Sequence, residues 1–222
     1  MRFSSFCYTV LLLFAMCSTA HATTFRFDTD PFANTNVRNI PGRQIVGGED
    51  FISFSIGSDV FSLDPSVFGV GNSVNFVNAS ASAIPAGDVN VVVLQTFDDD
   101  NNPLTPFGAG NAADLIANRI TTPGPGFFIY FNQGLNLPRL VYSTDLSDTN
   151  ADLRILARML NLFGPSGQNA IPTFTAANFE FTASSGVPEP SSLSLILAGG
   201  LIGGCFYLLR RRTGAGSLAD VR

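Results

Sequence analysis

Short runs in which apolar and polar residues alternate most strongly constrain the fold of this 222-residue chain. Ile and Phe alternate with Ser over 52–56, and Val89, Val91 and Val93 lie on one face of a segment that extends to Phe97. A period of two residues is typical of strands with one buried face. Glycine and proline turn residues separate these runs. The sequence therefore predicts an all-β fold, an antiparallel β-sandwich or jelly-roll-like body with one or two short helices, rather than alternating βαβ units.

Further strands are expected at 24–27, 74–77, 127–131, 139–143 and 179–182, of which 127–131 is apolar at every position and suits a central strand. A helix is expected over 112–119, with Asn111 as its N-cap. The segment 151–162 fits both a helix face and a strand. We interpret it as a strand that forms a hairpin with 139–143, because its apolar residues alternate from Leu153 to Met159.

The residue types that the body lacks exclude several classes of chemistry. Residues 23–186 contain no lysine, histidine, cysteine or tryptophan. Nucleophilic catalysis that depends on histidine or cysteine, zinc ligation by those residues, lysine Schiff bases and disulfides are therefore excluded there. The body has seven arginines against fifteen carboxylates, a net charge of −8. Such a surface repels phosphates, so no nucleic-acid partner is expected.

The first 22 residues have the pattern of a secretory signal peptide. Arg2 provides a positive start, residues 10–16 form a short apolar core, and Ala20-His21-Ala22 fits the small-x-small cleavage rule. Signal peptidase is therefore expected to cut after Ala22, which makes Thr23 the first residue of the mature chain. An uncleaved anchor is the alternative, but the apolar core is short for a membrane span.

The last forty residues combine three features in a fixed order. Val187-Pro188-Glu189-Pro190 is held extended, because proline fixes φ and restricts the residue before it. An uncharged apolar run of seventeen residues, 193–209, follows at the lower length limit of a membrane-spanning helix. Arg210-Arg211-Arg212 ends this run and predicts that this end is cytoplasmic, so the body lies on the other side of the membrane.

This order of motif, span and arginine cluster resembles the PEP-CTERM sorting signal of exported proteins of Gram-negative bacteria. The resemblance covers Val187 to Arg212 and does not extend to the fold before it. It implies recognition by an exosortase, which is a membrane transpeptidase-like enzyme. It also implies cleavage near the Val-Pro-Glu-Pro motif and transfer to the cell surface or extracellular matrix. Many proteins of this family come from species that secrete exopolysaccharide and form biofilm.

The patterns divide the chain into five parts. These are a signal peptide over 1–22, an extracytoplasmic body over 23–182, a linker with the sorting motif over 183–192, a transmembrane helix over 193–209 and a basic cytoplasmic tail over 210–222. The expected protein is not an enzyme. It is first anchored in the inner membrane and then delivered outside, with a structural or binding role in exopolysaccharide.

An acidic turn is the sharpest candidate for a metal site. Asp98, Asp100 and Asn102 match the first three ligand positions of an EF-hand loop, and Ca²⁺ prefers such oxygen ligands. The pattern then breaks, because Pro103 stands at the glycine position and Ala109 at the glutamate position. A turn after a strand explains the same residues. Calcium is therefore a weak candidate, and no firm metal site or cofactor is expected.

Two alternative functions stay open at this stage. A carbohydrate-binding module stacks sugars on aromatic rings, and Tyr130 and Tyr142 lie in predicted strands of this body. A glycoside hydrolase pairs a carboxylic acid with a nearby carboxylate, and Glu49 and Glu180 are the body's two glutamates.

Overall fold

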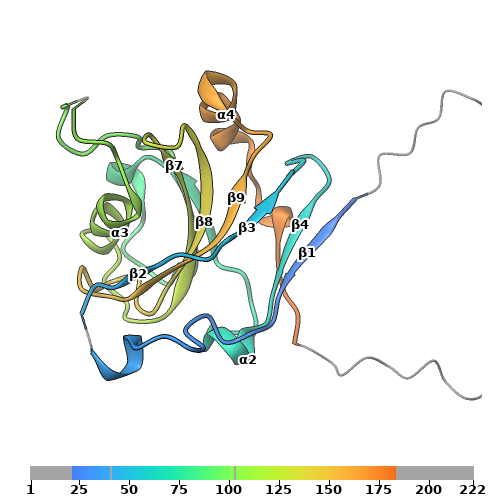
Figure 1. Ribbon diagram of the computed structural model, residues 1–222, viewed down its shortest axis with the longest axis vertical. Helices are drawn as coiled ribbons and strands as arrows, with labels where there is room; N and C mark the ends of the chain where they lie inside the picture. Colours follow the sequence, from blue (N-terminus) through green and yellow to red (C-terminus); the bar gives the residue numbers. More distant parts are fainter. Residues whose placement is uncertain (1–21, 41, 103, 184–222) are drawn as a thin grey trace, which may run out of the picture. The chain divides into compact units, whose positions relative to one another are not determined.

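The computed structural model describes residues 22–40, 42–102 and 104–183, which lie in a compact unit that ends at Ala183 (Figure 1). The strands are β1 (Thr24–Phe27), β2 (Ile45–Val46), β3 (Asp50–Ile52), β4 (Val60–Leu63), β5 (Phe76–Ala79), β6 (Val91–Leu94), β7 (Gly126–Asn132), β8 (Leu137–Ser143), β9 (Leu153–Met159) and β10 (Phe179–Phe181). The helices are α2 (Pro65–Phe68), α3 (Ala109–Ala117) and α4 (Gly164–Ala170), with 3-10 turns η1 (Val37–Asn39), η2 (Ala81–Ala83), η3 (Ile171–Thr173) and η4 (Ala176–Asn178). The expected body of mostly β structure with few short helices is confirmed.

The strands form two sheets of different character. The larger sheet has the order β2-β9-β8-β7-β6-β5, and β3 also pairs with β9. Within it, β7, β8 and β9 pair antiparallel, whereas the other pairs are parallel. The smaller sheet has the order β1-β4-β10, and both of its pairs are parallel. Two of its strands, β1 and β4, therefore come from the first third of the described chain and the third, β10, from its end.

The prediction of antiparallel pairing is wrong for the small sheet and for much of the large one. A period of two residues reports that one face of a strand is buried, but it does not report strand direction. β6 and β7 are buried at every position, run parallel and are connected through α3. Parallel neighbours need such a crossover and are covered on both faces. β6, α3 and β7 therefore form a βαβ unit, and the prediction of a fold without such units is wrong here.

Two hydrophobic cores lie on the two faces of the large sheet. The first joins both sheets, and its members include Phe54, Phe61, Leu63, Val91, Val93, Phe127, Ile129, Leu140 and Met159. The second lies under α3, and its members include Val92, Leu94, Ala112, Ile116, Phe128, Tyr130, Val141 and Ile155. Figure 1 shows the corresponding layers, with α3 on one side of β7, β8 and β9 and the strands β1 and β4 on the other.

The segment with ambiguous periodicity is a strand, as predicted. β9 pairs antiparallel with β8, which confirms the hairpin. The register shifts between Leu140 and Val141, so that Leu156 is an extra residue on β9. Such a bulge exchanges the faces occupied by the residues on its two sides. Ile155 consequently packs in the core under α3, whereas Met159 packs in the core between the sheets.

The other expected elements are present with shifted ends. α3 starts earlier than predicted, and Asn111 is not its N-cap: Gly108 holds that position, and its N–H donates to Asn111 Oδ1 at 3.1 Å. The strand expected over 74–77 lies at Phe76–Ala79, and the alternating pattern of 52–56 leaves the sheet after Ile52. The ladder of β6 is shorter than 89–97. The remaining strand predictions are confirmed as β1, β7, β8 and β10.

Candidate functional site

Most of the predicted processing residues lie outside the described part of the chain. These are Ala20, Val187-Pro188-Glu189-Pro190, the apolar run 193–209 and Arg210-Arg211-Arg212. Ala22 is described and exposed, and it precedes Thr23 and the first strand. At the other end, β10 ends at Phe181, six residues before Val187. Among residues 22–40, 42–102 and 104–183, no helix has both the length and the apolar character needed to cross a bilayer.

The acidic turn draws three carboxylates together. Single oxygens of Asp98, Asp99 and Asp100 lie within 4.8 Å of one another. The turn itself uses these groups: Asp98 Oδ1 accepts two backbone N–H bonds, and Asp100 Oδ2 accepts the Thr105 hydroxyl at 2.6 Å. The Thr105 hydroxyl, followed by a backbone N–H, lowers the pKa of Asp100. The oxygen of Asn102, the third predicted ligand, accepts a backbone N–H at 3.1 Å. Calcium binding here stays a prediction.

The two glutamates do not form the pair that glycoside hydrolysis needs. Glu180 is exposed on β10 of the small sheet, whereas Glu49 is buried beside β3 of the large sheet. Burial alone would raise the pKa of Glu49, but hydrogen bonds from its own backbone N–H, Arg158 and Arg139 hold it at about 2. A general acid requires the opposite shift. The described geometry therefore gives the hydrolase alternative no support.

The two tyrosines are unsuitable as a stacking platform for sugars. Tyr130 is 0% exposed and Tyr142 is 7% exposed. The Tyr142 hydroxyl donates to the carbonyl of Phe68 at 2.8 Å, and the Tyr130 hydroxyl accepts from Asn132 Nδ2 at 2.9 Å. Both rings are part of the cores, and their hydroxyl groups satisfy internal partners. The sequence could not reveal this burial, because both faces of β7 and β8 are covered.

A cluster of charged residues at the edge of the large sheet was not found from the sequence. Arg139 on β8 lies directly opposite Arg158 on β9, and both pair with the same oxygen of Glu49. The Arg158 guanidinium lies 5.3 Å from the centre of the Phe51 ring. Like charges at opposed strand positions repel, so Glu49 is needed to neutralise them. The hairpin of β8 and β9 was predicted, but finding this cluster also requires the register of that hairpin and the parallel pairing of β3 with β9, which local patterns do not record.

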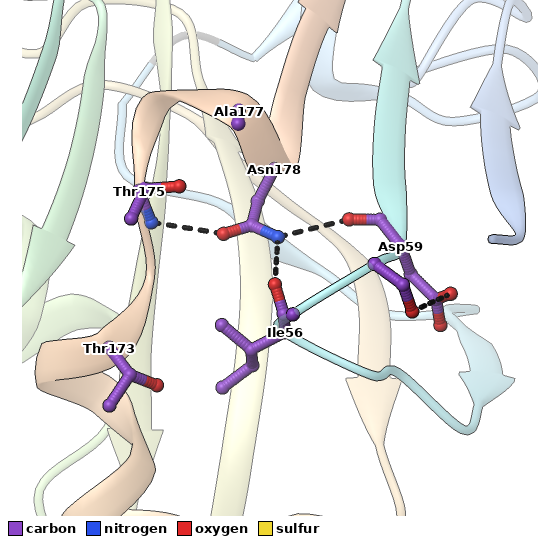
Figure 2. Close-up of a pocket in the computed structure, with 8 residues that line it drawn as sticks. Ile56, Asp59, Thr173, Thr175, Ala177 and Asn178 are labelled. Atoms are coloured by element: carbon purple, nitrogen blue, oxygen red, sulfur yellow. Dashed lines mark hydrogen bonds between the residues drawn. The ribbon is translucent and has the colours of Figure 1, made fainter. Parts of the chain in front are cut away.

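A pocket of about 390 Å³ lies where the strands of the small sheet begin. It is lined by the turn before β4 and by the segment that leads into β10, with Asp59 and Asn178 at its base (Figure 2). Asn178 Nδ2 donates to the carbonyls of Ile56 and Asp59 at 2.6 and 3.0 Å, and its Oδ1 accepts from Thr175 N at 2.9 Å. The Asn178 side chain therefore links the start of β10 to the turn before β4, the central strand of the small sheet.

The Asp59 side chain similarly links the turn before β4 to Thr23, the residue just before β1. Its side chain is buried, and the residue is 4% exposed. Oδ1 accepts from Thr23 N at 2.9 Å and from the Ser58 hydroxyl at 3.2 Å, and Oδ2 accepts from Ser55 N at 2.8 Å. Burial raises the pKa of Asp59, but the hydrogen bonds from Ser55, Thr23 and Ser58 outweigh it and lower the pKa. The carboxylate is thus ionised and hydrogen-bonded inside the fold.

In the sequence, Asp59 and Asn178 are ordinary turn residues. Gly57-Ser58-Asp59 reads as a polar turn before an apolar strand, and no pattern distinguishes a buried turn carboxylate from a solvated one. No protein-family model, curated protein or solved structure matches this chain.

Proposed function

We propose that this chain is the precursor of an exported surface or matrix protein of the PEP-CTERM type, with a sandwich-like β body. The ordered motif, apolar run and arginines of residues 187–212, behind an N-terminal signal peptide, are the observation that carries the proposal. Signal peptidase releases the N-terminus, the 193–209 helix arrests the chain in the inner membrane, and an exosortase cuts near Glu189. The body then works at the cell surface or in the extracellular matrix.

The arrangement of the body supports processing at both ends. Thr23, which immediately precedes β1 and accepts a hydrogen bond from Val60 N, directly follows the expected signal cleavage site, and the last strand ends at Phe181, before the sorting motif. Both hydrophobic cores are built from residues between these limits.

We assign the body a structural or binding role in exopolysaccharide rather than a catalytic one. The body lacks histidine, cysteine and lysine, and Glu49 is committed to two arginines. Its remaining acidic groups give it a strongly anionic surface that favours solubility in a hydrated polymer layer.

Deleting Pro188-Glu189-Pro190 is expected to hold the protein in the inner membrane. The deletion removes the extended segment that the exosortase must grip and leaves the span and the arginines intact. Cell fractionation in a host that has the exosortase measures the result. Deleting Ala183-Ser184-Ser185, which shortens the linker by the same length, is the matched control and should reach the surface.

Two results would contradict the proposal. One is a deletion variant that reaches the surface as efficiently as the control. The other is a surface form of the unmodified protein in which mass spectrometry still detects peptides from Leu193 onward.

A further inference from the structure

The buried carboxylate of Asp59 has only neutral hydrogen-bond donors in the described structure. They are the backbone N–H groups of Thr23 and Ser55 and the hydroxyl of Ser58. No ion pair is found for Asp59 among residues 22–40, 42–102 and 104–183. A carboxylate that is 4% exposed is normally paired with a cation, because desolvation of an unpaired charge is costly.

The donor at Thr23 is the atom that export is expected to convert into a cation. Hydrolysis of the Ala22–Thr23 bond adds water, leaves a carboxylate on Ala22 and frees the amine of Thr23, which takes a proton at neutral pH. Thr23 N already lies 2.9 Å from Asp59 Oδ1, and the Thr23 carbonyl accepts from Val60 N at 3.0 Å. Thr23 is thus held by hydrogen bonds at both its N–H and its carbonyl, although both Ala22 and Thr23 are exposed.

We propose that the new α-ammonium group of Thr23 forms a buried-carboxylate ion pair with Asp59, so that signal-peptide removal locks the small sheet. This inference rests on the proposed function, because it requires cleavage after Ala22. The same nitrogen that donates one neutral hydrogen bond in the precursor becomes a charged donor in the mature chain. Charge-assisted hydrogen bonds are about twice as strong as neutral ones.

The position of the pair explains its effect on the sheet. Asp59 immediately precedes β4, Thr23 immediately precedes β1, and Asn178 binds the Asp59 carbonyl immediately before β10. The starts of all three strands therefore meet at Asp59. The charged side chains on the neighbouring strands are Arg26 and Glu180, both at the register of Ser62, and Arg26 pairs with Asp28.

The chain offers an unusually clean readout, because it contains no lysine and its α-amine is therefore its single amine. The mature protein is purified after export of the full chain, and N-terminal sequencing identifies its first residue. The rate of acetylation by an N-hydroxysuccinimide ester is then measured from pH 6 to 10, because only the unprotonated amine reacts. The same protein unfolded in urea gives the reference profile.

The ion pair is expected to raise the pH midpoint of the acetylation profile by about one unit relative to the urea reference. This shift corresponds to a rate about tenfold lower at neutral pH. Asp59→Asn should return the midpoint to the reference value, whereas Glu180→Gln, which removes an exposed charge from the same sheet, should not. Simple burial of the amine, without an ion pair, would slow its reaction and lower the midpoint, because desolvation disfavours the ammonium form.

A second measurement does not depend on any variant. Because the folded pKa of the amine is raised, the stabilisation is present below the pKa of the unfolded amine and is lost as the pH rises through the folded value. Acetylated mature protein should melt roughly 2–6 °C below the free form at pH 7, and the difference should vanish near pH 10.

The outcomes separate the two proposals. A first residue other than Thr23 would overturn the cleavage that the proposed function requires. If Thr23 is first and its amine titrates as in urea, with equal melting temperatures for the two forms, the ion pair is overturned while the proposed function stands.

Discussion

Replacing Glu49 with alanine is expected to lower the free energy of unfolding by about 3–5 kcal/mol at pH 7. The Glu49 side chain is 6% exposed and accepts from Arg139, which is 13% exposed, and from Arg158, which is 28% exposed. Its removal leaves two arginines facing each other across β8 and β9 with no counter-charge. Chemical denaturation of the purified body, followed by circular dichroism, measures the loss.

The matched control for this change is Glu180→Ala, which removes the body's other glutamate from an exposed position on β10. Surface substitutions of this kind change stability by about 0.5 kcal/mol or less. Equal effects of the two substitutions would contradict the role assigned to Glu49.

The pH dependence of stability gives a second check on Glu49. Its folded pKa of about 2 lies below the ordinary value of 4.5, so its contribution is present above pH 4.5 and is lost as the pH falls toward 2. The stability difference between the unmodified protein and Glu49→Gln should therefore be largest near neutral pH and shrink across that window. A difference that stays constant down to pH 2 would show that ionisation of Glu49 contributes nothing.

Truncating the chain before β10 is expected to abolish cooperative folding, whereas truncating it after Ala183 is expected to leave folding intact. Phe179 is 5% exposed and packs against Phe61 and Phe76, with both ring separations at 5.7 Å. Loss of one buried phenylalanine alone costs about 3–5 kcal/mol, a large share of the roughly 5–15 kcal/mol that stabilises a typical domain. The missing strand also exposes the backbone edge of β4.

Thermal unfolding of chains 23–178, 23–183 and 23–192 tests this prediction. The two longer chains should unfold cooperatively at the same melting temperature, and the shortest should show no cooperative transition. A 23–183 chain with Phe179→Ser separates loss of the side chain from loss of the backbone pairs. Equal melting temperatures for 23–178 and 23–183 would show that β10 is dispensable.

Local sequence patterns predicted individual strands and a hairpin of consecutive strands, but not the pairing of strands that are far apart in the chain. The apolar run in 139–143 and the alternation in 153–159 predicted the β8–β9 hairpin, because the nine residues 144–152 join strands that are consecutive in the chain. The small sheet escaped prediction, because β1 and β10 pair in parallel with β4 over separations of 36 and 118 residues, and local patterns carry no information about such partners. β4 was missed for a further reason: Phe61, Ser62 and Leu63 alternate over only three residues, which is too short a run to distinguish a strand from the turns around it.

The candidate sites also differ in whether their residues are close together or far apart in the sequence. The proposed processing motif was predicted from the sequence alone, since an exosortase or a signal peptidase acts on a contiguous stretch of chain. Glu49, Asp59 and Asn178 acquire their meaning only from partners far away in sequence, such as Arg158 and Thr23. The sequence wrongly suggested that the two tyrosines could be exposed on a sheet face. A strand pattern does not show which faces of a sheet are covered, and in this fold both faces are covered.

In the proposed export route, the position of β4 between β1 and β10 also sets the order in which the strands of the small sheet can pair. A chain that emerges from a translocation channel with its N-terminus first delivers β1 and β4 early, but the third strand arrives last. Until then the edge of β4 that β10 will occupy has no strand beside it. In the proposed export route, residues 182–192 span at most about 40 Å when extended, which is enough for β10 to reach that edge while the apolar run 193–209, proposed as the membrane span, is still in the bilayer. Completion of the domain can thus precede its release.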